Sequence, residues 1–229
     1  MLNLNYPVMK IKYIFPVTAV VTILALTALH FSGIQPEDDP FRDIENETVL
    51  PMLRHLPRQH GGMNVPAVDG RFLYDLILEK GYRRGLEIGT SNGYSGLWIG
   101  LALKQNEGEL VTLEINPLAA DEARANFRKA GLENVIEVRT ADALEEIPNV
   151  PGTFDFIFID AWKPDYYKYL QLVRERVREG GAITAHNVTG GSRRQMRDFL
   201  EAIENDPLLE TTIHPLSGQG ISVSIIKGN

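Results

Sequence analysis

The sequence predicts an α/β protein built on a doubly wound, seven-stranded, mostly parallel sheet. Short apolar runs alternate with helical patterns at the spacing typical of β-α-β units. The run over residues 154–160 is apolar on both faces, as expected for a central parallel strand. Residues 211–214 and 221–226 have no helical pattern between them, which indicates a closing antiparallel pair.

The remaining elements follow from periodicity and from their end signals. In the helix expected over 66–81, Phe72, Leu73, Leu76 and Ile77 are predicted to face inward. Asn116 and Pro117 supply an N-cap and a first-turn residue for the helix 118–130. The other strands are expected at 84–88, 109–114, 134–139 and 182–186, and the other helices at 43–56, 94–103, 161–177 and 190–204.

The first 36 residues are predicted to form a hydrophobic transmembrane anchor. No Asp, Glu, Lys or Arg occurs over 13–36, and a helix over the apolar stretch 14–31 would be about 27 Å long, near the thickness of a bilayer core. Lysines precede this stretch and acids follow it, which predicts a domain on the outer side. A cleaved signal peptide and a start at Met9 are the alternatives. Three parts are expected: 1–36 as the anchor or signal segment, 37–62 as a linker with a helix, and 63–229 as the α/β domain.

Composition excludes several classes of function. The chain has 229 residues, a formal net charge of −7 and no cysteine. Without a basic field, no nucleic-acid partner is expected. Without cysteine, disulfides, thiolate metal sites and a cysteine nucleophile are excluded. A small molecule is the expected partner.

The chain is organised around a strand, a turn and a helix start over residues 84–98. Glycines bracket the turn from Gly89 to Gly93, so a ligand can approach the backbone and the free N–H groups of the following helix. The dinucleotide pattern G-x-G-x-x-G fails, because Ser91 stands where its second glycine belongs. The same residues also spell G-x-S-x-G, the nucleophile elbow of α/β-hydrolases. A hydrolase would use Ser91, Asp160 and His186, with 60–62 as an oxyanion loop. In the α/β-hydrolase fold several strands precede the elbow and one carries the oxyanion loop, whereas only helices precede the strand at 84–88 here.

Polar residues lie at or just after the end of each successive strand, at Glu87, Glu114, Asp142, Asp160 and His186–Asn187. The carboxyl ends of parallel strands meet at one edge of the sheet, where such folds bind ligands. An acid at position 114 could accept both hydroxyls of a ribose. Asp142 could accept from an adenine amino group or cap the short turn 143–147.

Six short motifs give the chain from 63 to 227 a specific resemblance to class I S-adenosylmethionine-dependent O-methyltransferases of the catechol/caffeoyl-CoA type. The motifs are Met63-Asn64-Val65, Leu86-Glu87-Ile88-Gly89 with Gly93-Tyr94-Ser95, Glu114-x-Asn116-Pro117, Asp160-x-Trp162-Lys163, Asn187, and Ile226-Lys227-Gly228. The resemblance implies a Rossmann-like methyltransferase fold and methyl transfer to a hydroxyl of a small, aromatic vicinal diol. It also implies metal assistance and a possible homodimer. The cosubstrate that it implies is cytoplasmic, which conflicts with the outer location expected for the domain.

The same resemblance assigns roles to residues. Lys163 would be the general base, and Trp162, Lys163 and Asn187 would contact the substrate. Asp160, His186 and Asn187 would bind a divalent metal. The cosubstrate would contact Met63, Val65, Glu87, Gly89, Ser91, Gly93, Tyr94, Ser95, Glu114, Ile115, Asp142, Ala143 and Asp160.

Two departures from the family pattern bear on the chemistry. The family usually has Asp-Asn where this chain has His186–Asn187. An imidazole disfavours Mg²⁺ and favours Mn²⁺, Fe²⁺ or Zn²⁺; the alternative is a metal-free site with His186 as a second base. Residues 213–215 lack the acid that binds a catechol hydroxyl, so catechol itself is not the expected acceptor. A membrane-tethered S-adenosylmethionine-binding domain without catalysis is the remaining alternative.

Overall fold

Seven strands form a single sheet in the order β3-β2-β1-β4-β5-β7-β6 in a computed structural model that describes residues 39–58 and 64–228. Strands β1 to β5 run parallel, while β7 is antiparallel to both β5 and β6. The strands are β1 Arg84–Ile88, β2 Glu109–Glu114, β3 Ile136–Thr140, β4 Phe154–Ile159, β5 Val177–His186, β6 Leu209–His214 and β7 Ile221–Ile226. The predicted doubly wound sheet with a closing antiparallel pair is confirmed.

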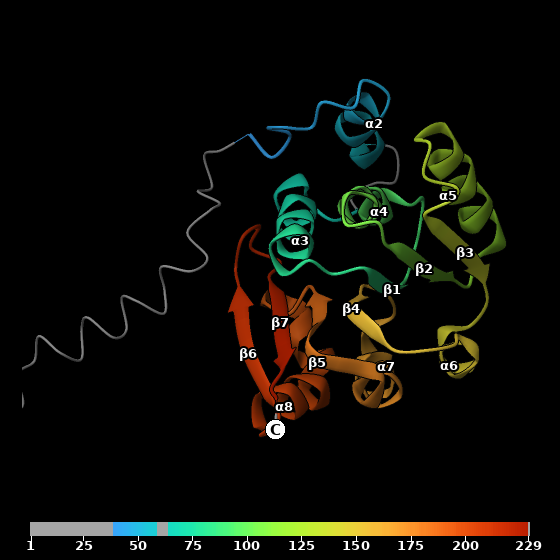
Figure 1. The fold of residues 1–229 in the computed structure, drawn as a ribbon. Coiled ribbons are helices and arrows are strands. Elements are labelled where there is room, and N and C mark those ends of the chain that lie inside the picture. Colours follow the sequence, from blue (N-terminus) through green and yellow to red (C-terminus); the bar gives the residue numbers. More distant parts are fainter. Residues whose placement is uncertain (1–38, 59–63, 229) are drawn as a thin grey trace, which may run out of the picture. The chain divides into compact units, whose positions relative to one another are not determined.

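Helices cover both faces of this sheet. Figure 1 shows α3, α4 and α5 on one face and α6, α7 and α8 on the other. The chain order changes direction between β1 and β4, the kind of position where doubly wound sheets bind ligands. The α-helices are α2 Val49–His55, α3 Ala67–Lys80, α4 Tyr94–Gln105, α5 Pro117–Lys129, α6 Ala143–Glu146, α7 Tyr166–Val173 and α8 Arg197–Asn205.

Three predicted helices differ from those observed. The helix expected over 43–56 begins only at Val49, because Asp43 has a φ of 60° and the Asn46 side chain accepts from the backbone of Thr48 and Val49. The helix expected over 161–177 is α7 flanked by 3₁₀ turns, and β5 already begins at residue 177. The first part of the helix expected over 190–204 is also 3₁₀, and α8 begins at residue 197.

The core confirms the predicted inward faces. Every residue of β4 is buried, and the four apolar side chains predicted to face inward from α3 are at most 1% exposed. Helix α3 lies close to α4 at Gly70, where a Cβ atom would come within 2.4 Å of the Trp98 indole. This close packing needs glycine, and it fixes the helix that carries the neighbouring Asp69.

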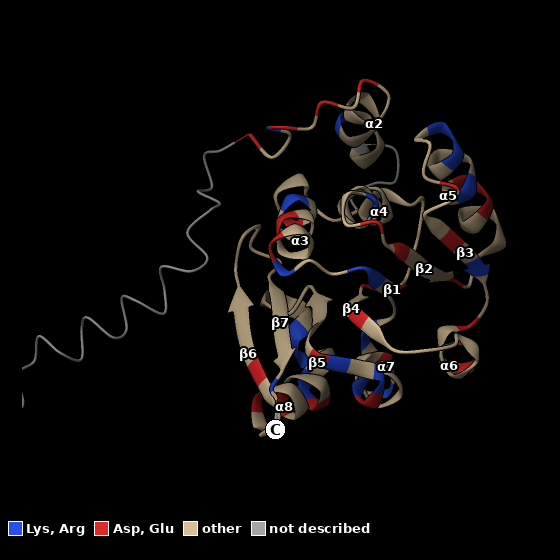
Figure 2. Cartoon of the chain, viewed as in Figure 1, with Lys and Arg blue, Asp and Glu red and all other residues tan. Residues whose placement is uncertain are grey.

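The predicted anchor over 1–36, together with Met63 and the predicted oxyanion loop 60–62, lies outside the described residues. Within the described ranges, no helix has the length and apolar character needed to cross a membrane. Acidic and basic residues are mixed along α3 and α5, as Figure 2 shows.

Candidate active site

The strand register brings the predicted polar residues to one edge of the sheet. Ile88 at the end of β1 pairs with Leu113 of β2 and with Ile159 of β4. In turn, Ile159 pairs with Ala185 of β5, so Asp160 and His186 follow neighbouring strand ends. The backbone nitrogen of Asp160 donates to the carbonyl oxygen of Ile88 at 2.9 Å, which continues the ladder into the site.

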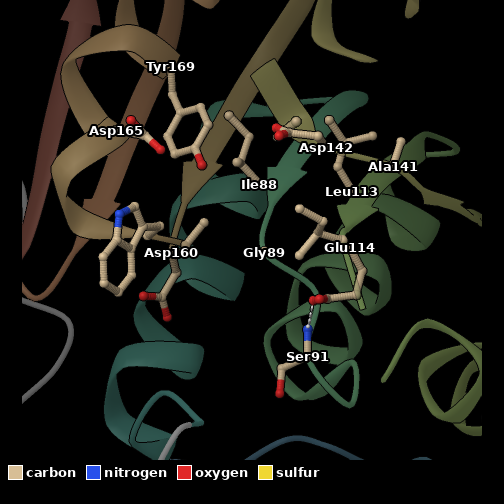
Figure 3. Close-up of a pocket in the computed structure, with 14 residues that line it drawn as sticks. Ile88, Gly89, Ser91, Leu113, Glu114, Ala141, Asp142, Asp160, Asp165 and Tyr169 are labelled. Carbon is tan, nitrogen blue, oxygen red and sulfur yellow. Dashed lines mark hydrogen bonds between the residues drawn. The ribbon is translucent and has the colours of Figure 1, made fainter. Parts of the chain in front are cut away.

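A cavity opens at this edge, and most of the predicted cosubstrate residues line it. Figure 3 shows Glu114 and Asp160 on either side of Gly89. The predicted residues on its wall are Gly89, Ser91, Glu114, Ile115, Asp142, Ala143, Asp160 and Trp162. The other lining residues are Ile88, Leu113, Ala141, Ala161, Asp165 and Tyr169.

The turn after β1 needs glycine at Gly89. This residue has a φ of 95°, and a Cβ atom would lie 2.3 Å from the carbonyl oxygen of Asp160. Gly93 is also left-handed, with a φ of 87°, and it is the N-cap of α4. The loop therefore passes close to β4 and leaves backbone at the cavity wall.

Glu114 fixes this loop from the end of β2. Its Oε2 atom accepts from the backbone nitrogens of Ser91 at 2.8 Å and Thr90 at 3.2 Å. Its Oε1 atom accepts from the Asn116 nitrogen at 2.9 Å. Two carboxylate oxygens have about four lone-pair sites, so Glu114 keeps acceptor capacity for a ribose hydroxyl.

Glu87 does not lie on the cavity wall, contrary to its predicted direct contact with the cosubstrate. It is fully buried, and its two oxygens accept from the hydroxyls of Ser95 and Thr112, each at 2.6 Å. Burial raises the pKa of Glu87 to about 7, although these two hydrogen bonds act in the opposite direction. Glu87 ties β1 to α4 and β2 behind the loop.

Four further predicted cosubstrate residues, Val65, Gly93, Tyr94 and Ser95, are likewise buried and absent from the cavity wall. Tyr94 is the first residue of α4, and the Ser95 hydroxyl donates to Glu87. Both residues therefore stabilise the start of α4 behind the loop.

Asp142 caps α6 and also lies on the cavity wall. Its Oδ1 atom accepts from the Leu144 nitrogen at 2.9 Å, so it caps α6. It also lies on the cavity wall beside Ala141 and Ala143. A capping carboxylate retains a second oxygen, which can accept from a ligand amino group.

Beyond Asp160, a chain of polar side chains extends away from the cavity wall. Asp160 Oδ1 lies 2.7 Å from Nζ of Lys163, and this ammonium also donates to the Tyr166 hydroxyl at 2.7 Å. The other oxygen, Asp160 Oδ2, is 3.2 Å from Nδ1 of His186. On the far side of the ring, Nε2 of His186 is 2.8 Å from Oδ2 of Asp69.

These contacts shift the pKa values of Asp160 and His186. Burial alone would raise the pKa of Asp160, but the hydrogen bond and charge of His186, with those of Lys163, hold this pKa below its ordinary value. Burial alone would lower the pKa of His186. The hydrogen bonds and charges of Asp160 and Asp69 outweigh that effect and raise it to about 9.

The side chains predicted to bind a divalent metal do not fit that role. Both ring nitrogens of His186 face carboxylates, and both oxygens of Asp160 already have partners. The Asn187 amide donates to the Gln219 side chain at 2.8 Å. Within 39–58 and 64–228, no group of three or more His, Cys, Asp or Glu side chains is placed to hold a metal ion.

The same contacts argue against the hydrolase alternative. A triad needs one ring nitrogen of His186 free to take a proton from Ser91. In the structure, both nitrogens of this ring lie next to carboxylates, and Ser91 is held through its backbone by Glu114.

Four residues that the sequence did not mark lie next to predicted site residues or to one another. Asp69 contacts His186, Tyr166 contacts Lys163, Gln219 contacts Asn187, and Ser217 contacts Asp69. A signal existed for Asp69, which precedes Phe72, Leu73 and Leu76 at the i, i+3, i+4, i+7 spacing of a buried helix face. Ser217 and Gln219 come from the loop between β6 and β7, where no periodic pattern marks them.

Trp162 is a wall residue and not part of the core. Its side chain is 68% exposed although it lines the cavity, and it precedes the 3₁₀ turn that carries Lys163. A large aromatic surface at a cavity rim can stack on a flat ligand.

The sheet order, the glycine turn after β1 and the acids that follow the strands together define a class I S-adenosylmethionine-dependent methyltransferase fold. A family model described as O-methyltransferase matches residues 43–221. The chain belongs to this O-methyltransferase family.

Individual relatives agree with that assignment. A catechol O-methyltransferase of Niastella koreensis is 39% identical over 130 residues, which cover 55% of this chain and 58% of the relative. Caffeoyl-CoA O-methyltransferase 2 of Populus trichocarpa is 31% identical over 196 residues, which cover 75% of this chain and 78% of that relative. The chain thus matches little more than half of the catechol enzyme.

Solved structures give the same result. The crystal structure of an O-methyltransferase from Bacillus cereus in complex with SAH is similar with a TM-score of 0.69 and 31% identity. The similarity covers 89% of this chain and 97% of that protein.

Proposed function

We propose that this protein transfers the methyl group of S-adenosylmethionine to a hydroxyl of a small aromatic acceptor. One observation carries the proposal: the Gly89 turn, Glu114 and Asp142 line a single cavity that ends at Asp160, next to Lys163. The relatives named catechol and caffeoyl-CoA O-methyltransferases support the choice of acceptor class.

Cosubstrate binding would use the part of the cavity formed by β1, β2 and β3. Glu114 would accept from the ribose hydroxyls, and Asp142 from the adenine amino group. Ile115, which is 68% exposed on the cavity wall, would cover the adenine ring. The buried Glu87 would act indirectly, by holding the start of α4 in place.

The chemical step needs a deprotonated oxygen aimed at the methyl carbon. The Lys163 ammonium would first give a proton to solvent; its neutral Nζ would then take the proton of the acceptor hydroxyl, and the oxygen would attack the methyl carbon. The carbon–sulfur bond then breaks, and its electron pair stays on sulfur to give S-adenosylhomocysteine. Asp160 and Tyr166 fix the position of Nζ through their 2.7 Å contacts. Trp162 would stack on the acceptor ring.

The test is calorimetry followed by turnover. S-adenosylmethionine should bind the full chain with one site, and mass spectrometry should detect methylated product from a panel of phenols and catechols. Binding without turnover on any acceptor would favour the non-catalytic alternative. Absence of binding would contradict the proposal.

Membrane attachment and a homodimer stay proposals that rest on the sequence pattern of 1–36 and on the family resemblance. Extraction of cell membranes with alkaline carbonate tests the first: an anchored chain stays with the lipid, and a peripheral one is released.

A further inference from the structure

His186 lies between two carboxylates, and one of them comes from an unexpected element. Asp69 on α3 is fully buried, and its Oδ2 atom is 2.8 Å from Nε2 of His186. The same oxygen accepts from the Ser217 hydroxyl at 2.6 Å, and Asp69 Oδ1 has no hydrogen-bond partner among the described residues. Asp69 therefore joins α3 to the end of β5 and to the loop between β6 and β7.

Each nitrogen of the His186 ring has a carboxylate next to it. Asp160 Oδ2 lies 3.2 Å from Nδ1 of His186, opposite the contact with Asp69. When both carboxylates are ionised they only accept hydrogen bonds, and each ring nitrogen then donates. An imidazole that donates from both nitrogens is a cation.

Charge balance leads to the same conclusion. Asp69 and Asp160 bring two negative charges into a site where their side chains are 0% and 15% exposed. Lys163 brings one positive charge, and a doubly protonated His186 brings the second. Buried charges are tolerated when they are paired, and this cluster is paired without a further ion. A divalent ion would have to displace the proton on Nδ1, which would leave a net positive charge.

We propose that His186, held as a cation between Asp69 and Asp160, occupies the place of the divalent metal that the family resemblance implies, so that this enzyme works without one. Asp69 is then a positioning residue for His186. The catalytic part of this inference rests on the proposed methyl transfer. An acceptor in this site needs one hydroxyl only, because no metal has to chelate two neighbouring oxygens.

The most direct test is nitrogen NMR of the full chain labelled with ¹⁵N-histidine, with the His186 signals assigned from His186→Asn. Both ring nitrogens should carry protons at pH 7.5, and the signals should stay unchanged in EDTA and after one equivalent of Mn²⁺. A ring nitrogen without a proton, or selective broadening of His186 by Mn²⁺, would overturn the proposal.

Two variants sharpen the result. Asp69→Asn should shift the His186 signals, whereas Asp75→Asn should leave them unchanged, since Asp75 lies on the same helix and pairs with Arg71.

His186→Asp restores the usual acid of the family and should bind Mn²⁺ at least tenfold more tightly than the wild type in calorimetry. Equal Mn²⁺ affinity in both proteins would contradict the inference. The NMR measurement decides even if His186→Asp does not fold, and S-adenosylmethionine binding in the same samples separates this result from failure of the proposed function.

Discussion

The backbone nitrogen of Ser91 donates a 2.8 Å hydrogen bond to Oε2 of Glu114, so the last residue of β2 holds the turn that follows β1. The same carboxylate faces the cavity. One side chain thus shapes the loop and presents an acceptor to the ligand, which makes it the first position to test.

Replacing Glu114 with alanine should weaken S-adenosylmethionine binding by roughly 10- to 100-fold. The reason is the loss of charge-assisted hydrogen bonds, each worth about 1.5–3 kcal/mol. Calorimetric titration gives the dissociation constant. Glu109→Ala is the matched control, because Glu109 lies at the exposed start of the same strand and pairs with Arg84. Equal affinities of both variants would show that Glu114 has no special role.

Gly89→Ala should abolish cosubstrate binding and lower thermal stability. A Cβ atom there meets the carbonyl oxygen of Asp160 at 2.3 Å, and the φ of 95° adds strain. Gly81→Ala is the control: this glycine also has a positive φ, 64°, but no atom of the described residues lies within 4 Å of the added Cβ. It should cost about 1–2 kcal/mol of stability and leave binding intact. Normal binding by Gly89→Ala would contradict the placement of the turn.

Lys163→Met should reduce kcat by about 10²–10⁴-fold, the usual contribution of a general base, with little change in cosubstrate affinity. Lys168→Met is a close control, since Lys168 also pairs with an acid three residues before it, Asp165, at 2.7 Å but is 61% exposed. The comparison needs initial rates on an acceptor found in the panel. A drop of the same size in both variants would remove Lys163 from the chemistry.

Glu87 makes stability depend on pH. Its folded pKa of about 7 lies above its ordinary value of 4.5, so the folded state binds the proton more tightly than the unfolded state. The contribution of Glu87 to the free energy of unfolding is therefore greatest below pH 4.5. It decreases as the pH rises to about 7, by an amount on the order of 3 kcal/mol. Urea titrations of the wild type and Glu87→Gln at several pH values measure this. The variant should lose most of the decrease, and an unchanged pH profile would refute the assignment.

The sequence predicted the sheet well because the strands are strongly patterned. A fully apolar β4 and the acids after β2, β3 and β4 mark both the central strand and the binding edge. The helix ends were less well predicted, because 3₁₀ turns on either side of α7 follow from local packing and carry no distinct sequence signal.

The site was predicted at its strand ends and missed where distant segments meet. Asp69 is 117 residues from His186 along the chain, and only the packing of α3 brings the two together. Glu87 belongs to one of the predicted motifs, but strand alternation directs its side chain behind the turn, toward α4. Membership of Glu87 in a motif therefore does not predict whether its side chain faces the cavity or the interior behind the loop.

A crystal structure of the protein with S-adenosylhomocysteine tests the central claim most directly. The account predicts ligand density between Glu114 and Asp160, with the ribose hydroxyls within hydrogen-bond distance of Glu114 and the sulfur directed toward Lys163. Density for the ligand elsewhere on the molecule, or a ribose that makes no contact with Glu114, would contradict it.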